Sequence, residues 1–264
     1  MLLRLKSDRY CFCTTVYRLG AVLVLFLSVL AGCGDDDSDT PATVVSAAGD
    51  ITASVNQYRA LLGDPNNGGT PGPLSAGRRE INWDGVPDAQ SAPNFLPRDF
   101  FLGRGAIFDA PGGSGVQVSA DSNNPAGAAV RFGNINPSYA NIFQTFSAER
   151  LFSPIGSNVV DVTFTVPGSQ TPAVVRGFGA VYTDVDGNSS SFEYFDKNGK
   201  SLGRFVVPAA NNGLSFLGVA FPDPIVARVR IVYGNSALGP DESATVDVAV
   251  MDDFFYGEPQ AITP

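Results

Sequence analysis

Val160-Asp161-Val162-Thr163-Phe164-Thr165-Val166 alternates apolar and polar residues without a break. Successive side chains of a β-strand point to opposite faces of its sheet, so this alternation predicts a strand with one face in a core and one turned outward. The same period of two runs through residues 225–233 and 246–250. These three stretches place the fold in the all-β class.

Shorter runs of similar composition predict further strands in the second half of the chain and in part of the first. They lie at residues 80–84, 105–108, 115–119, 128–132, 174–183, 190–195, 201–207 and 214–221. Asp196-Lys197-Asn198-Gly199 separates two of them and carries the Asn-Gly pair of a tight hairpin. Ten or more short strands with little helix predict an antiparallel β-sandwich, and a jelly-roll-like arrangement is the commonest way to close that number.

One short helix is expected ahead of the strands, at residues 51–62. Asp50 can cap its start, Val55 and Tyr58 share one face, and Gly63 can end it. A loop rich in Gly and Pro follows, up to residue 78. Residues 79–258 are expected to form a single β-sandwich domain, followed by a tail at 259–264.

The N-terminal segment is typical of an export signal, because basic residues precede a short apolar run and small residues. The run ends in Leu30-Ala31-Gly32-Cys33, which resembles the lipobox of bacterial lipoproteins. The resemblance implies that residues 1–32 are removed and that Cys33 is lipidated and anchors the protein in a membrane. Gly34, in place of the aspartate that retains lipoproteins in the inner membrane, favours the outer membrane. An ordinary signal peptide with a chance cysteine is the alternative.

Residues 33–50 begin with a polar, acidic stretch and are expected to form a disordered tether. The chain has 17 Lys and Arg against 26 Asp and Glu. Four of the basic residues and one acidic residue precede Cys33, which leaves 13 against 25 in the rest. Such an acidic surface argues against nucleic acid as a partner, because phosphates need a basic patch.

The chain has no histidine, and Cys33 is the one cysteine outside the signal. Catalysis by a Ser-His-Asp or Cys-His group and zinc sites built on His or Cys are therefore excluded. Any chemistry must rest on carboxylates, on Ser, Lys or Tyr, or on a hard cation held by oxygen.

Asp184-Val185-Asp186-Gly187-Asn188 places two carboxylates two residues apart in a turn that contains glycine. Calcium takes six to eight oxygen ligands, and such turns supply several of them. An EF-hand is excluded, because its twelfth position would be Phe195 rather than glutamate. A β-turn that uses these residues for backbone reasons is the alternative.

The order of motifs from residue 177 to 257, which ends in Met251-Asp252-Asp253-Phe254-Phe255-Tyr256-Gly257, resembles a known group of domains. These are the jelly-roll domains of bacterial exported surface proteins, many of them sorted by a C-terminal PEP-type anchor, and they are similar in fold to carbohydrate-binding modules. The resemblance implies a fold more than an activity.

The resemblance also implies a place for calcium, because carbohydrate-binding modules often hold a structural calcium with an acid near the final strand. Asp252 and Asp253 follow the last alternating stretch, and we expect one of them to join Asp184 and Asp186 around one calcium ion. The alternative is a strand-end pair with one acid exposed and the other bonded to backbone amides.

Trp83 is the single tryptophan. It is either a platform on which a sugar ring stacks or part of a core that is rich in aromatic side chains.

The sequence therefore predicts a lipid-anchored envelope or surface protein that acts as a non-catalytic binding module for glycan or another surface polymer. The alternatives are a polysaccharide hydrolase that depends on carboxylates and a purely structural envelope protein. The acids considered for the hydrolase lie beside expected strands: Glu80, Asp84, Glu149, Asp186 and Glu193.

Overall fold

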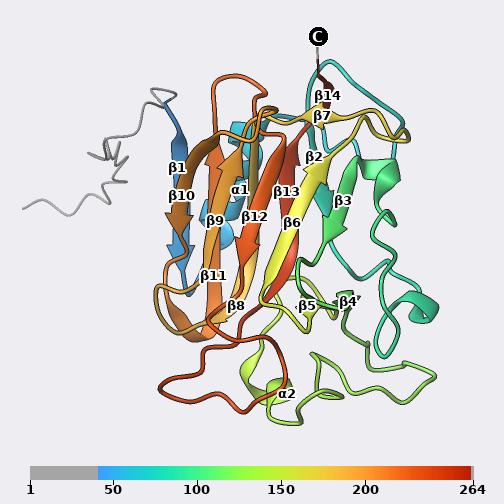
Figure 1. Cartoon of the computed structure of the whole chain (residues 1–264), viewed down its shortest axis with the longest axis vertical. Helices are drawn as coiled ribbons and strands as arrows, with labels where there is room; N and C mark the ends of the chain where they lie inside the picture. The colour runs from blue at the N-terminus through green and yellow to red at the C-terminus, as the bar shows by residue number, and fades with distance from the viewer. Residues whose placement is uncertain (1–40, 263–264) are drawn as a thin grey trace, which may run out of the picture. The chain divides into compact units, whose positions relative to one another are not determined.

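The computed structural model describes residues 41–262, which form an antiparallel β-sandwich, as the alternating stretches predict (Figure 1). The larger sheet has the strand order β1-β11-β8-β13-β5-β4, and β2 also pairs with β13. Its strands are β1 (Thr43–Ala48), β2 (Arg78–Ile81), β4 (Gly115–Val118), β5 (Phe152–Ile155), β8 (Gly177–Val185), β11 (Ala210–Ala220) and β13 (Val250–Gly257).

The smaller sheet has the order β10-β9-β12-β6-β3. Its strands are β3 (Ala106–Asp109), β6 (Val159–Phe164), β9 (Ser191–Phe195), β10 (Ser201–Val206) and β12 (Arg228–Val232). A two-stranded ribbon joins β7 (Ala173–Val174) to β14 (Gln260–Ala261). The chain crosses between the two main sheets from β8 to β9, from β10 to β11 and on to β12 and β13, a pattern typical of jelly-roll sandwiches.

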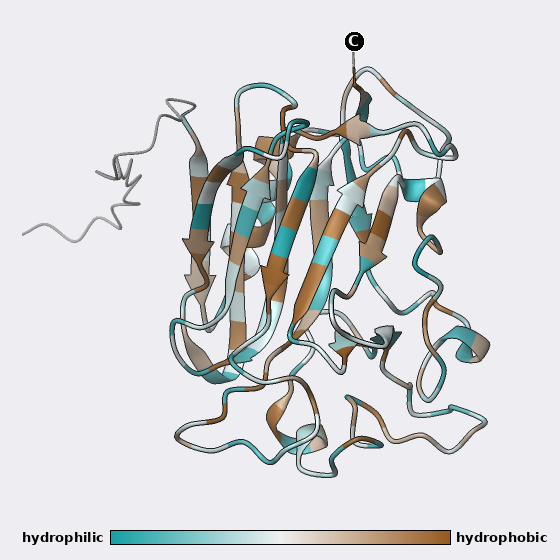
Figure 2. Ribbon diagram, in the orientation of Figure 1, coloured by the Kyte–Doolittle hydropathy of each residue, from teal (hydrophilic) through white to brown (hydrophobic). Residues whose placement is uncertain are grey.

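Strand β6 shows why the alternating stretches form this fold. Val160, Val162 and Phe164 are buried, whereas Asp161 and Thr163 between them are half-buried. Figure 2 shows the same alternation of apolar and polar residues along β6 and β12. The inner side chains pack against those of the larger sheet in one core cluster, which explains the period of two.

Strands β8 and β13 are buried along their whole length, because the larger sheet is covered on both faces. The smaller sheet covers one face, and helix α1 (Thr52–Leu62) packs on the other. The Oδ1 atom of Asp50 accepts a hydrogen bond from the N–H of Thr52 at the start of the helix, at 3.1 Å, and Gly63 ends it with φ of 99°. The expected helix is thus present.

The sandwich begins earlier than the sequence predicts. Residues Thr43–Ala48, which were assigned to the tether, form β1 and pair in register with β11 from Thr43↔Ala220 to Ala48↔Ser215. This stretch is short and follows acidic residues, so it lacks the longer alternation of the other strands. The remainder of the expected tether before residue 41, the signal and Cys33 lie outside the described residues.

Residues 246–249 are not a strand, although their apolar and polar residues alternate. Val248 and Val250 are buried in a small separate core with Phe132, Tyr139 and Phe143, so the period reflects the packing of a loop. The strand that follows is β13, which starts at Val250 and contains both Asp252 and Asp253. Residues 128–132 form only an isolated bridge, at Val130, to Ala120.

One end of the sandwich carries the short helix α2 (Tyr139–Ile142) and the long loop that precedes β13 (Figure 1). Two single turns of 3-10 helix, η1 (Asp88–Gln90) and η2 (Leu102–Arg104), lie in the segment between β2 and β3. Within residues 41–262 no helix is both long and apolar enough to span a bilayer.

Candidate metal centre

Within the described part of the chain, one group of three acidic side chains has the spacing of a metal site. It consists of Asp184 at the end of β8, Asp186 in the turn after it, and Glu242 in the loop before β13. One carboxylate oxygen from each residue lies within 4.8 Å of the other two. We call this group the acid triad.

Asp184 is the buried member of the acid triad, and the rest of the protein satisfies only half of its carboxylate. The backbone φ of Asp184 is 66°, a left-handed conformation that aspartate tolerates better than most residues. Its Oδ1 accepts a hydrogen bond from the N–H of Asn212 at 2.7 Å. No donor reaches its Oδ2, and the buried Oδ1 of Asp186 is likewise without one. Buried carboxylate oxygens normally have partners, so these two atoms require a ligand or a proton.

The pKa shifts in the acid triad also indicate that its carboxylates need a cation or a proton. Burial, together with the nearby carboxylates of Asp184 and Asp186, raises the pKa of Glu242 to about 8. Burial also raises the pKa of Asp184 above its ordinary value. In the absence of a cation the group therefore retains a proton near neutrality, because like charges in a site of low polarity cannot all ionise.

A depression of about 440 Å³ opens beside the acid triad at this end of the sandwich. Asp186 and Glu242 line it, whereas the buried Asp184 does not. None of the residues that form its wall is basic. The other lining residues are Ser138, Ile142, Asn211, Asp241, Ser243 and Ala244.

These donors fit a hard divalent cation. Three carboxylates can supply three to six oxygens, and calcium accepts this variable, one- or two-oxygen binding in a flexible shell. Magnesium demands a nearly ideal octahedron and keeps its waters. Zinc prefers nitrogen and sulfur ligands, whereas residues 41–262 contain neither histidine nor cysteine.

Two of the three members of the acid triad are residues that the sequence analysis singles out. Asp184 and Asp186 are brought together as expected, but neither Asp252 nor Asp253 belongs to the group, and Glu242 is its third member. Glu242 lies in a loop of turn residues and has no pattern that marks it as a ligand. The fold alone brings it to the end of β8.

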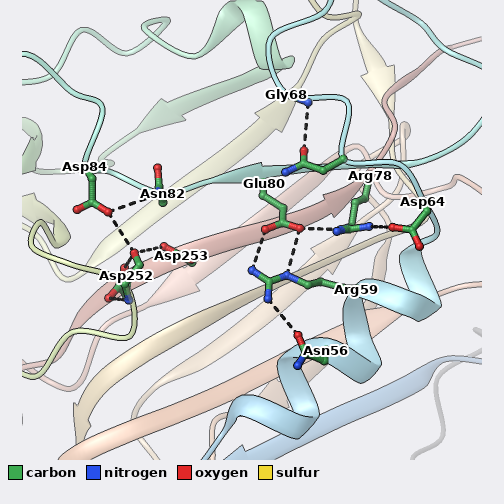
Figure 3. Close-up of polar contacts among 12 residues, drawn as sticks. Asn56, Arg59, Asp64, Gly68, Arg78, Glu80, Asn82, Asp84, Asp252 and Asp253 are labelled. Carbon is green, nitrogen blue, oxygen red and sulfur yellow. Dashed lines mark hydrogen bonds and ion pairs between the residues drawn. The ribbon is translucent and has the colours of Figure 1, made fainter.

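Asp252 and Asp253 instead form a second cluster with Asp84, around the hydroxyl of Ser147. The Oγ atom of Ser147 lies 2.7 Å from Asp253 Oδ1, 3.2 Å from Asp252 Oδ1 and 3.4 Å from Asp84 Oδ2. Figure 3 shows the three aspartates gathered at one place. A hydroxyl donates one proton, so it can satisfy only one of these three carboxylates at a time.

The second cluster ties a loop to the larger sheet. Asp252 Oδ2 accepts hydrogen bonds from the backbone N–H groups of Phe146 and Ser147, at 2.6 and 3.2 Å. Burial raises the pKa of Asp252 well above its ordinary value, and that of Asp253 to a smaller extent. The alternative for these two residues is a pair with one acid bonded to backbone amides and the other exposed. Asp252 has the backbone bonds, but Asp253 is only 6% exposed.

Trp83 lies in the core, and its ring has no exposed face on which a sugar could stack. It stacks on Phe152 with centroids 4.3 Å apart and meets Phe254 edge-on at 4.9 Å. Its Nε1–H donates to the backbone oxygen of Asp252 at 2.9 Å. The alternative of Trp83 as a ligand-binding platform is therefore ruled out in this structure, because the aromatic residues of both sheets enclose the ring.

Two of the acids considered for a hydrolase are held in ion pairs or hydrogen bonds. Glu80 accepts hydrogen bonds from both Arg59 and Arg78, at 2.7–3.1 Å (Figure 3). Glu149 accepts hydrogen bonds from the backbone and side chain of Ser122.

No protein-family model matches this sequence, and no curated protein matches it either.

Proposed function

We propose that this protein is a calcium-binding β-sandwich module, exported and lipid-anchored through Cys33, that acts in the bacterial envelope by binding a glycan or another surface polymer. The observation that supports the calcium site is the buried Asp184 Oδ2, which has no donor and lies in a group with Asp186 and Glu242. A divalent cation supplies the missing partner for this oxygen and cancels the mutual repulsion of the three carboxylates.

The position of the site suggests what the ion does for the protein. Asp184 and Asp186 belong to β8 and the turn after it, whereas Glu242 comes from the loop that leads to β13. An ion between them joins two segments that are far apart in the sequence. Burying like charges together costs free energy in the metal-free protein. The ion offsets this cost, so it stabilises the folded state.

The test is calorimetric titration of the chelated protein with calcium, together with thermal unfolding in EGTA and in millimolar calcium. Calcium at a hundredfold excess over Kd should add about 2.7 kcal/mol to the free energy of unfolding. Asp184→Asn and Glu242→Gln should abolish or greatly weaken the stoichiometric binding. Asp223→Asn is the matched control. Asp223 is an exposed carboxylate that is distant in the sequence from the acid triad and from Asp252 and Asp253, so its removal should leave the calcium titration unchanged.

Variants of Asp252 and Asp253 distinguish the acid triad from the calcium site that the sequence predicts, which includes one of these two residues. Asp252→Asn together with Asp253→Asn should leave the calcium stoichiometry at one if the acid triad holds the ion. A melting temperature unaffected by calcium, or a calcium effect that survives Asp184→Asn, would refute the proposed centre.

We favour binding over hydrolysis because Glu80 and Glu149, two of the acids considered for catalysis, are held by structural partners, and Asp186 belongs to the acid triad. A glycan array run beside a polysaccharide-hydrolysis screen separates the classes. Reducing ends released by the wild-type protein, and lost in one Asp or Glu variant, would establish the hydrolase. The absence of any bound or hydrolysed polymer would favour a structural envelope protein.

A further inference from the structure

We propose that the calcium ion in the acid triad is itself part of a ligand site, and that an uncharged saccharide with adjacent hydroxyl groups binds in the neighbouring depression and completes the ion's coordination shell. This inference rests on the proposed function, and it specifies the ligand class that the same site takes.

The first step is the one-sided arrangement of the protein's ligands. Asp184 lies buried beneath the site, and Asp186 and Glu242 extend from it to the wall of the depression. An ion held by these three carboxylates therefore has protein oxygens behind it and the open depression in front. Calcium takes six to eight oxygens, so positions on the open side are left to water or to a ligand.

The second step is the charge balance. Three carboxylates hold an ion with two positive charges, and Asp241 adds a fourth carboxylate to the lining of the depression. No arginine or lysine is among the lining residues to offset the excess. An anionic polymer would be repelled from this site, whereas the hydroxyl oxygens of a neutral sugar are hard donors that suit calcium and carry no charge.

The third step is the character of the wall. Ser138, Asn211 and Ser243 supply hydroxyl and amide groups that can bond to the sugar's remaining hydroxyls. Ile142 and Ala244 supply an apolar part against which the C–H groups of a sugar ring can pack. A volume of about 440 Å³ lies within the range of small-ligand sites and holds one or two sugar rings.

Adjacent hydroxyls are favoured over single ones for a geometric reason. Two oxygens on neighbouring carbons can bind the same ion and displace two waters at once, so the second contact is gained with little further loss of freedom. A polymer that lacks such pairs has no comparable advantage over water.

The experiment is affinity electrophoresis of the whole mature protein through gels that contain soluble mannan, xylan, dextran or polygalacturonate, with calcium or with EGTA. At least one neutral polysaccharide should retard the protein in calcium only. Periodate oxidation of that polysaccharide, which cleaves adjacent hydroxyl pairs, should abolish the retardation. Polygalacturonate should retard the protein least.

A paired variant separates the sugar from the ion. Asn211→Ala combined with Ser243→Ala should weaken the sugar affinity about tenfold, the effect of one or two net hydrogen bonds, and leave the calcium titration unchanged. Normal calcium binding without retardation by any neutral polysaccharide would overturn this inference but not the proposed centre. Retardation that persists in EGTA or after periodate would also overturn it. Loss of calcium binding in the wild-type protein would instead refute the proposed function.

Discussion

Two buried acids of this protein, Glu258 and Asp184, are balanced in different ways. Glu258 receives two hydrogen bonds of 2.7 Å from the guanidinium of Arg79, and both side chains are almost completely buried. Asp184 is equally buried, but it has one backbone N–H donor and no cationic side chain bonded to it. The first arrangement is complete within the chain, whereas the second requires a cation or a proton from outside.

The buried pair of Arg79 and Glu258 gives a first prediction. Glu258→Gln leaves the Arg79 guanidinium buried without a counter-charge, so we expect it to lower the free energy of unfolding by about 3–5 kcal/mol. The matched control is Asp109→Asn, which breaks the exposed pair with Arg98 and should cost less than about 1 kcal/mol. Urea denaturation measures the free energy of unfolding of both variants. Equal losses would show that the buried pair contributes no more to stability than the exposed one.

The raised pKa of Glu242 gives a second prediction, for the protein without calcium. The folded protein binds a proton on Glu242 up to about pH 8, whereas the unfolded chain releases it near pH 4.5. The stability of the chelated protein should therefore fall as the pH rises through this window and then level off. Asp184, whose pKa is also raised, acts in the same direction.

Calcium should reverse this dependence, because the ion displaces the proton and binds more tightly as the pH rises towards 8. Glu242→Gln should flatten the slope of melting temperature against pH in EGTA between pH 5 and 8. Asp223→Asn provides the control and should retain the slope. A wild-type slope of the opposite sign would contradict the assignment.

At the scale of elements, α1 depends on a flat strip of the larger sheet. Gly177, Gly179 and Gly218 lie on neighbouring positions of β8 and β11, and the ring of Tyr58 from α1 lies directly over them. The hydroxyl of Tyr58 donates to the backbone oxygen of Val219 at 2.8 Å. The absence of side chains at these glycines lets the ring approach the sheet, and the hydrogen bond fixes its position.

Gly218→Ala gives a third prediction. A Cβ atom at this position would lie 2.7 Å from atoms of the Tyr58 ring, so the helix must shift, and we expect a loss of about 1–3 kcal/mol in the free energy of unfolding. Gly187→Ala is the control, because nothing lies within 4 Å of its Cβ position. In a Tyr58→Leu background, Gly218→Ala should lower the free energy of unfolding by less than it does in the wild-type protein. An equal loss in both backgrounds would mean that the contact with the Tyr58 ring is not the cause.

The strands that an alternation of apolar and polar residues predicts are those with one exposed face. Strands β6 and β12 alternate because water reaches their outer side chains. Strand β13 is buried on both faces, so Phe254 and Phe255 are adjacent apolar residues and no period marks the strand. The valines at 246–250 alternate for another reason, since they fill the small core under α2.

At the scale of the whole molecule, the candidate site could be predicted only in its local part. Asp184 and Asp186 share one turn, so their spacing is visible in the sequence. Glu242 reaches them through the crossing of the chain between sheets, which no local pattern encodes. Asp252 and Asp253 are on a strand next to β8, yet the bulge in their pairing and the loop at Phe146 and Ser147 give them another partner.

The proposed lipid anchor gives the last prediction, which concerns how the whole module would be held at a membrane. The sandwich is acidic, so attraction to anionic lipid cannot hold it at a membrane, and the acyl chains proposed on Cys33 would have to do so. Growth of an expressing bacterium with a palmitate analogue should label the wild-type protein and leave Cys33→Ala unlabelled and released from the membrane fraction. Cys11→Ala and Cys13→Ala are matched controls, because both residues precede the lipobox and should not affect labelling. Labelling that persists in Cys33→Ala would mean that the protein is not a lipoprotein of this kind. The proposed calcium centre would be unaffected, because all three of its residues lie within residues 41–262.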